Sequence, residues 1–141
     1  MAFKKPIGTF LDEEENPLLE KSQAAMLGIG FDLTASFGKG TRLGPHAILA
    51  ATRQVEFESG ATGKRLDKKV RVHNLGMLEY DYKKKLSEKQ VEKETKKMVN
   101  DAYKLLKKPV EQKKFLIVFG GDHSTTNATL NALTEKIDGK K

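Results

Sequence analysis

The sequence predicts an α/β fold of three layers, in which helices cover both faces of a mainly parallel sheet. Three apolar segments of strand length alternate with three segments of helical character along the chain. The clearest strand, which we expect to be central in the sheet, is residues 115–119, Phe-Leu-Ile-Val-Phe, an unbroken run of β-forming side chains that is typical of a strand covered on both faces. A regular alternation of strand and helix is the pattern of α/β domains, so it favours parallel pairing.

The first strand, helix and second strand follow from local patterns. Residues 24–29, Ala-Ala-Met-Leu-Gly-Ile, form an apolar run that enters a glycine-rich loop over residues 34–44. Pro45 can begin a short helix after this loop, because proline fits the first turn of a helix. Residues 70–75 are the second strand candidate.

A long amphipathic helix is predicted between the second and third strands. Ser87 and Gln90 have the spacing of a capping box, in which two side chains satisfy free backbone N–H groups at the start of a helix. Apolar residues then recur at three- and four-residue steps, and Pro109 is expected to end the helix. We expect this helix to cover residues 87–107 and to bury Val91, Met98, Ala102 and Leu105.

Composition favours one domain without a nucleic-acid or membrane partner. The 141 residues, 38% of them hydrophobic, suffice for a modest core, and we divide them into an irregular polar arm (1–22) and one α/β domain (23–141). The net charge of +7 comes mainly from lysines interspersed with glutamates, which favours solubility over nucleic-acid binding. Absence of cysteine excludes disulfides and thiol chemistry. With no signal peptide and no apolar stretch of roughly 20 residues, we expect a cytoplasmic protein.

The most informative loop is Gly120-Gly-Asp-His-Ser124, which follows the clearest strand. Parallel sheets bind ligands at the carboxyl ends of their strands, and here Asp122 and His123 would bring a carboxylate and an imidazole to that edge. The alternative is a strand-to-helix turn in which Asp122 and Ser124 only cap the next helix. That helix would begin at Ser124 or Thr125 and carry Leu130, Leu133 and Ile137.

Two nucleotide-binding patterns are incomplete. The segment Gly28-x-Gly30 begins a dinucleotide-binding motif, but Leu33 stands where the third glycine belongs. Gly63-Lys64 is followed by arginine and lacks the earlier glycine of a phosphate-binding loop. Neither pattern predicts a nucleotide site.

Taken together, the two glycine loops resemble motifs of the ureohydrolases, the family of arginases and agmatinases. Residues 28–48 are similar to the N-terminal motif of that family, and residues 119–126, Phe-Gly-Gly-Asp-His-Ser-Thr-Thr, are similar to its first metal motif. The resemblance covers residues 24–137 and implies a partial arginase-like fold. Matching positions in the first motif are Gly28, Asp32, Ser36, Gly40, Arg42, Gly44, Pro45 and Ile48.

The chain also departs from the family pattern. Gly30 stands where the family usually has proline, and Gly38-Lys39 stands where it has Arg-Pro. Asn74-Leu-Gly-Met77 replaces an Asp-x-Gly-Asp turn after the middle strand. The later Asp-Ala-His-x-Asp and Ser-x-Asp-x-Asp motifs have no counterpart here, so the resemblance is to the N-terminal portion only.

The resemblance implies a manganese-dependent hydrolase that converts small guanidino compounds such as agmatine or arginine to an amine and urea. In the family two manganese ions hold the attacking hydroxide, because metal ions lower the pKa of bound water toward neutrality. By resemblance His123 is one metal ligand and Asp122 supports it, while no catalytic residue is assigned and the substrate-binding residues are unknown. His46 and His73 match no motif, and we expect them to be surface residues.

Three hypotheses follow. The one we favour is an incomplete ureohydrolase, inactive alone, which forms a homo-oligomer or joins a missing C-terminal half. The second is a non-catalytic binding or oligomerisation module derived from that family. The third is an unrelated α/β binding domain.

Overall fold

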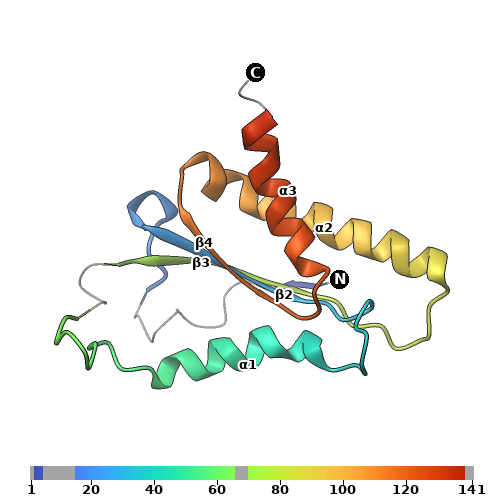
Figure 1. Cartoon of the computed structure of the whole chain (residues 1–141), viewed down its shortest axis with the longest axis horizontal. Coiled ribbons are helices and arrows are strands. Elements are labelled where there is room, and N and C mark those ends of the chain that lie inside the picture. Colours follow the sequence, from blue (N-terminus) through green and yellow to red (C-terminus); the bar gives the residue numbers. More distant parts are fainter. Residues whose placement is uncertain (1, 5–14, 66–69, 139–141) are drawn as a thin grey trace.

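A four-stranded sheet in the order β1-β3-β2-β4 forms the middle layer of the molecule (Figure 1). The computed structural model describes residues 2–4, 15–65 and 70–138. Strand β2 is central and pairs in parallel with both β3 and β4, whereas β1 pairs antiparallel with β3. The strands are β1 (Ala2–Lys4), β2 (Ala24–Gly30), β3 (Val72–Glu79) and β4 (Phe115–Gly120).

Helices cover both faces of this sheet, as the sequence predicts. Helix α1 lies below the sheet in Figure 1, and helices α2 and α3 lie above it. Each helix occupies the connection after one parallel strand, so the predicted three-layer α/β fold with a mainly parallel sheet is confirmed. The helices are α1 (Gly44–Ala51), α2 (Glu88–Glu111) and α3 (Thr125–Asp138), with short 3-10 turns at Leu19–Lys21, Thr41–Leu43 and Thr52–Gln54.

The central strand supplies side chains to two separate apolar layers. All seven residues of β2 are buried, because helices cover both of its faces and strands pair with both of its edges. Leu27 and Ile29 pack into the cluster beneath α2 and α3, whereas Met26 packs on the other face with Leu49 of α1. The larger cluster also contains Phe31, Leu78, Tyr80, Met98, Ala102, Leu106, Val110, Ala128 and Ala132.

Helix α2 begins where the sequence predicts it and ends later. Ser87 is the N-cap, its side chain accepts from the backbone N–H of Gln90, and the reciprocal contact completes the predicted capping box. Pro109 does not end the helix, which continues to Glu111. Proline removes only one backbone hydrogen bond here, and Pro109 and Val110 are buried, so packing on the core holds the last turn in helical form. Of the four residues expected to be buried, Met98 and Ala102 are fully buried and Val91 and Leu105 only partly.

Three predictions about strands were incomplete or wrong. Strand β3 runs to Glu79, whereas the sequence predicts its end at Leu75. Gly76 has a φ of 105° and lies where the pairing register with β2 shifts, and this irregularity lets the strand continue beyond it. Strand β4 is an edge strand among the described residues, and not the central one, because only β2 pairs with it. The arm expected to be irregular contributes strand β1, whose partner lies far along the chain; residues 5–14 lie outside the described part.

Within the described part of the chain, no helix is long and apolar enough to cross a membrane.

Candidate functional site at the carboxyl edge of the sheet

The loops after the three parallel strands meet at one edge of the sheet. Each loop brings an aspartate there: Asp32 after β2, Asp81 after β3 and Asp122 after β4. Parallel strands have their carboxyl ends on the same side, so residues far apart in the sequence become neighbours. The predicted position of Asp122 and His123 at the carboxyl end of a parallel strand is therefore confirmed.

Asp122 joins the β4 loop to the β2 loop. One of its carboxylate oxygens, Oδ2, accepts from the backbone N–H and the hydroxyl of Thr34, at 2.9 and 2.8 Å. The other, Oδ1, accepts from the backbone N–H and the hydroxyl of Ser124, at 3.0 and 2.6 Å. Four donors fill the usual capacity of a carboxylate. Asp122, only 8% exposed, is thus used to hold two loops together.

Close backbone packing explains the glycine before this aspartate. The backbone N–H of Asp122 donates to the carbonyl of Phe31 at 2.8 Å. A Cβ added at Gly121 would overlap the backbone of Phe31, so a residue with a side chain requires the two loops to separate. Gly121 therefore permits the approach that the Asp122–Thr34 contact needs.

His123, next to Asp122 in this loop, is exposed. Beside it, the hydroxyl of Thr125 donates to the carbonyl of Asp122 at 2.8 Å, so the loop also forms the local turn that was the alternative interpretation of Gly-Gly-Asp-His. Of the other histidines, His46 is exposed on α1, as expected. His73 is only half-buried and its ring Nδ1 lies 2.7 Å from the carbonyl of Pro17, near the start of β3 and away from the carboxyl edge.

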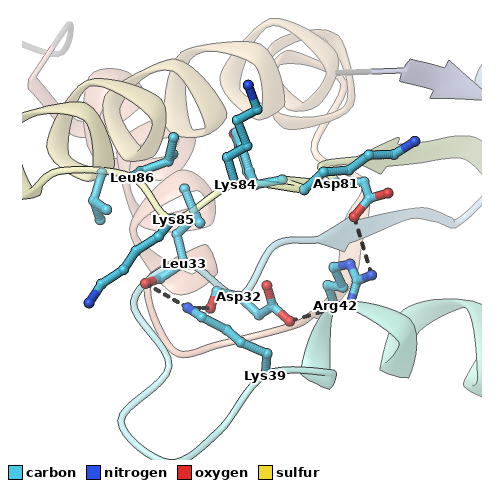
Figure 2. A pocket seen from close by; sticks show the side chains of 11 residues that line it. Asp32, Leu33, Lys39, Arg42, Asp81, Lys84, Lys85 and Leu86 are labelled. Atoms are coloured by element: carbon cyan, nitrogen blue, oxygen red, sulfur yellow. Dashed lines mark hydrogen bonds and ion pairs between the residues drawn. The ribbon is translucent and has the colours of Figure 1, made fainter.

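The first glycine-rich loop is held by its own motif residues. Asp32, 5% exposed, accepts from the backbone N–H of Gly40 at 2.7 Å. The guanidinium of Arg42 lies 3.8 Å from Asp32 and 3.3 Å from Asp81, so it links the β2 and β3 loops (Figure 2). The motif residue Asp32 therefore contacts the motif residues Gly40 and Arg42, and these contacts close the glycine-rich loop. Asp81 was missed in the sequence because its partner is 39 positions away.

Two departures from the family pattern have structural counterparts here. A Cβ at Gly30 would lie 2.7 Å from the carbonyl oxygen of Arg42, so glycine lets the loop return close to β2. The ammonium of Lys39 donates to the backbone carbonyls of Asp32 and Leu33 (Figure 2). The altered positions therefore contribute contacts to the loop.

Two tyrosines under α2 complete this edge. The hydroxyl of Tyr80 donates to Asp101 at 3.0 Å and that of Tyr82 donates to Glu94 at 2.9 Å. Burial, reinforced by the hydrogen-bonded carboxylate, raises the pKa of each phenol above its usual range. Both rings also meet Phe31 edge-on. These contacts keep the phenols protonated and anchor the β3 loop to α2.

The described residues do not by themselves fit a site for two manganese ions. His123 offers one imidazole, whereas both oxygens of Asp122 are already occupied by donors. In the ranges 2–4, 15–65 and 70–138, no three histidine, aspartate or glutamate side chains gather closely enough to hold a metal ion. A site for two hard cations needs several oxygen and nitrogen ligands, so no catalytic step can be assigned to this edge alone.

Comparison with known proteins identifies the class that this fold and edge define. A family model described as the Arginase family matches residues 22–141, and the chain belongs to that family. This excludes the hypothesis of an unrelated binding domain.

Individual relatives are longer than this chain. An N(1)-aminopropylagmatine ureohydrolase of Thermus thermophilus is 27% identical in an alignment of 131 residues that covers 88% of this chain and 39% of that protein. The arginase structure from Bacillus subtilis matches with a TM-score of 0.57 and 26% identity over 81% of this chain and 34% of its own. The agmatine ureohydrolase structure from Thermoplasma volcanium, at 22% identity, supports the fold, with a TM-score of 0.66 over 83% of this chain and 36% of its own.

Proposed function

We propose that this chain is the N-terminal part of a manganese-dependent ureohydrolase that converts a guanidino compound, such as agmatine or arginine, to an amine and urea. The observation that carries the proposal is membership of the arginase family over residues 22–141, together with the Gly-Gly-Asp-His loop at the carboxyl edge of the parallel sheet. The relatives named for agmatine derivatives and for arginine support the substrate class.

In this proposal His123 is one metal ligand and Asp122 positions it. The support is geometric: the imidazole is exposed at the edge, while the neighbouring carboxylate fixes the loop through four hydrogen bonds. The remaining ligands would come from a segment outside these 141 residues. When bound, manganese would supply a hydroxide at neutral pH.

The partner in this proposal is a segment that covers β4 and α3, either the C-terminal part of the enzyme or a second copy of the chain. Strand β4 pairs on one side only among the described residues. On α3, Leu130 and Leu133 are three positions apart and therefore lie on one side of the helix. Their side chains are 50% and 41% exposed. Unpaired strand edges and exposed leucines favour association.

The first test is activity of the isolated chain. We expect a homogeneous 141-residue monomer neither to bind two manganese ions tightly in calorimetric titration nor to release urea from agmatine or arginine. The reason is the ligand set: losing even a supporting partner of a metal ligand typically costs about 10- to 100-fold in affinity or activity. Turnover by the monomer would overturn the proposal that ligands come from elsewhere.

The second test uses the chain co-produced with the polypeptide encoded next to it. Replacing His123→Ala should abolish both manganese binding and urea release by the complex, whereas His46→Ala, at another exposed histidine, should leave both unchanged. Unchanged activity in His123→Ala would remove the proposed ligand. If the adjacent sequence supplies no further metal ligands and the complex is inactive, the alternative of a non-catalytic module derived from the family is favoured.

A further inference from the structure

A cavity of about 530 Å³ opens at the carboxyl edge between the loops that follow β2 and β3 (Figure 2). It is bounded by the Asp32–Arg42–Asp81 contacts on one side and by the start of α2 on the other. Its apolar lining comes from Leu33, Leu86 and Val91.

Positive charge dominates this cavity. Five cationic side chains line it against two carboxylates, those of Asp32 and Asp81. Both carboxylates already face the guanidinium of Arg42, and Asp32 also accepts from the backbone N–H of Gly40. The two carboxylates thus have partners already, and together with Arg42 they offset only one of the four charges that Lys39, Lys83, Lys84 and Lys85 bring to the cavity.

The lysines differ in how they are held. Lys39 is fixed by the carbonyls of Asp32 and Leu33, so its charge is placed at the cavity without a carboxylate to neutralise it. Lys83, Lys84 and Lys85 are exposed, and within the described ranges none has an ion pair or side-chain hydrogen bond. Figure 2 shows Lys84 and Lys85 extending in different directions from their loop. Their flexible stems allow the ammonium groups to turn toward one ligand.

This charge is opposite to what a guanidino substrate requires. A guanidinium cation would meet an excess of positive charge in the cavity. The cavity is therefore distinct in chemistry from the hydrolytic site of the proposed function, and its ligand is independent of that proposal.

We propose that this cavity binds a multivalent oxyanion, a small molecule bearing phosphate or several carboxylate groups. Lys83, Lys84 and Lys85 donate charge-assisted hydrogen bonds to it, and Lys39 supplies the fixed cation. Lys83, Lys84 and Lys85 all line the cavity on flexible stems beside the fixed Lys39, and the contacts of Asp32 and Asp81 with Arg42 limit competition from the cavity's own carboxylates.

The test is a titration of the 141-residue chain with inorganic pyrophosphate and, separately, with citrate at constant ionic strength, followed by amide NMR spectra. We expect saturable shifts confined to residues 32–42 and 81–86. The triple substitution Lys83→Gln, Lys84→Gln and Lys85→Gln should weaken the Kd by about tenfold or more. The matched control changes Lys93, Lys97 and Lys104, exposed lysines of α2 outside this cavity, to glutamine and loses the same charge.

The outcomes separate a site from diffuse attraction. Saturation by pyrophosphate alone assigns the cavity to phosphate groups, and saturation by both anions assigns it to polyanions generally; both support the proposal. It is overturned if neither anion saturates, if the α2 control weakens binding as much as the loop variant, or if agmatine competes for the same amides. Matching amide spectra of the unliganded variants would show that both are folded.

Discussion

At the scale of single residues, Asp122 does more for the carboxyl edge than its neighbour His123. Its contact with Thr34 joins positions separated by 88 residues, and its contact with Ser124 shapes the turn that starts α3. The loop that carries the exposed imidazole is therefore held by a buried carboxylate and by the loop after β2.

We expect Asp122→Ala to lower the free energy of unfolding by about 3 kcal/mol, because it leaves the buried donors of Thr34 and Ser124 without an acceptor. Urea denaturation followed by circular dichroism measures this change. The matched control is Asp81→Ala, which removes an aspartate with a 62% exposed side chain, and it should cost less than about 1 kcal/mol. Equal losses of unfolding free energy in the two variants would show that the hydrogen bonds between Asp122 and Thr34 do not stabilise the fold more than an exposed ion pair does.

At the scale of elements, the long helix α2 anchors the β3 loop through its carboxylates. Asp101 and Glu94 hold the hydroxyls of Tyr80 and Tyr82, and the two rings pack edge-on against Phe31. Helix, strand end and loop are thereby coupled at one place.

This coupling predicts a loss of stability in alkaline solution. Burial, with the hydrogen-bonded carboxylates, raises the pKa of both phenols in the folded chain, whereas in the unfolded chain they titrate near the usual value of about 10. Their contribution to stability is complete below pH of about 10 and is lost as the pH rises above it, because only the unfolded state then releases the protons.

The double substitution Tyr80→Phe and Tyr82→Phe should flatten the fall in unfolding free energy above that pH. Denaturation midpoints measured between neutral and alkaline pH provide the comparison. An unchanged slope in the double variant would mean that other groups cause the alkaline loss.

Local sequence patterns predicted where helices and strands lie better than they predicted which elements pair and where each element ends. The capping box at Ser87 and the apolar run at 115–119 are decided by neighbouring residues, so both were found from the sequence. The second strand was predicted to end at Leu75 and the long helix at Pro109, but a shift of register at Gly76 and a packed last turn let both elements continue. In both cases contacts with other parts of the fold, which the local sequence does not record, extend the element beyond its predicted end.

The candidate site was predicted in part for the same reason. The position of Asp122 and His123 after a strand follows from the local sequence, and the motif residues Asp32 and Arg42 follow from resemblance. The pairing of Asp122 with Thr34, and the arrival of Asp81 beside Arg42, depend on strands from distant parts of the chain. No local pattern records such contacts.

At the scale of the whole molecule, the open edge of β4 and the exposed leucines of α3 predict self-association. We expect light scattering to detect oligomers whose population falls when Leu130→Lys and Leu133→Lys are combined, because charged side chains oppose apolar contact. The control is Phe37→Ser, which removes an apolar side chain that is 99% exposed on the β2 loop. Equal effects of the two changes would point to general stickiness and not to this surface.

The central place of β2 also governs how the chain acquires its structure during synthesis. Both parallel neighbours of this fully buried strand, β3 and β4, are made after it. The apolar segment of β2 is therefore synthesised before the strands that shield it. The Asp122–Thr34 contact joins residues 88 positions apart, so it can form only after β4 has been made. Contacts of such long sequence separation form slowly, so the apolar segment of β2 stays without its pairing strands until both β3 and β4 have been made.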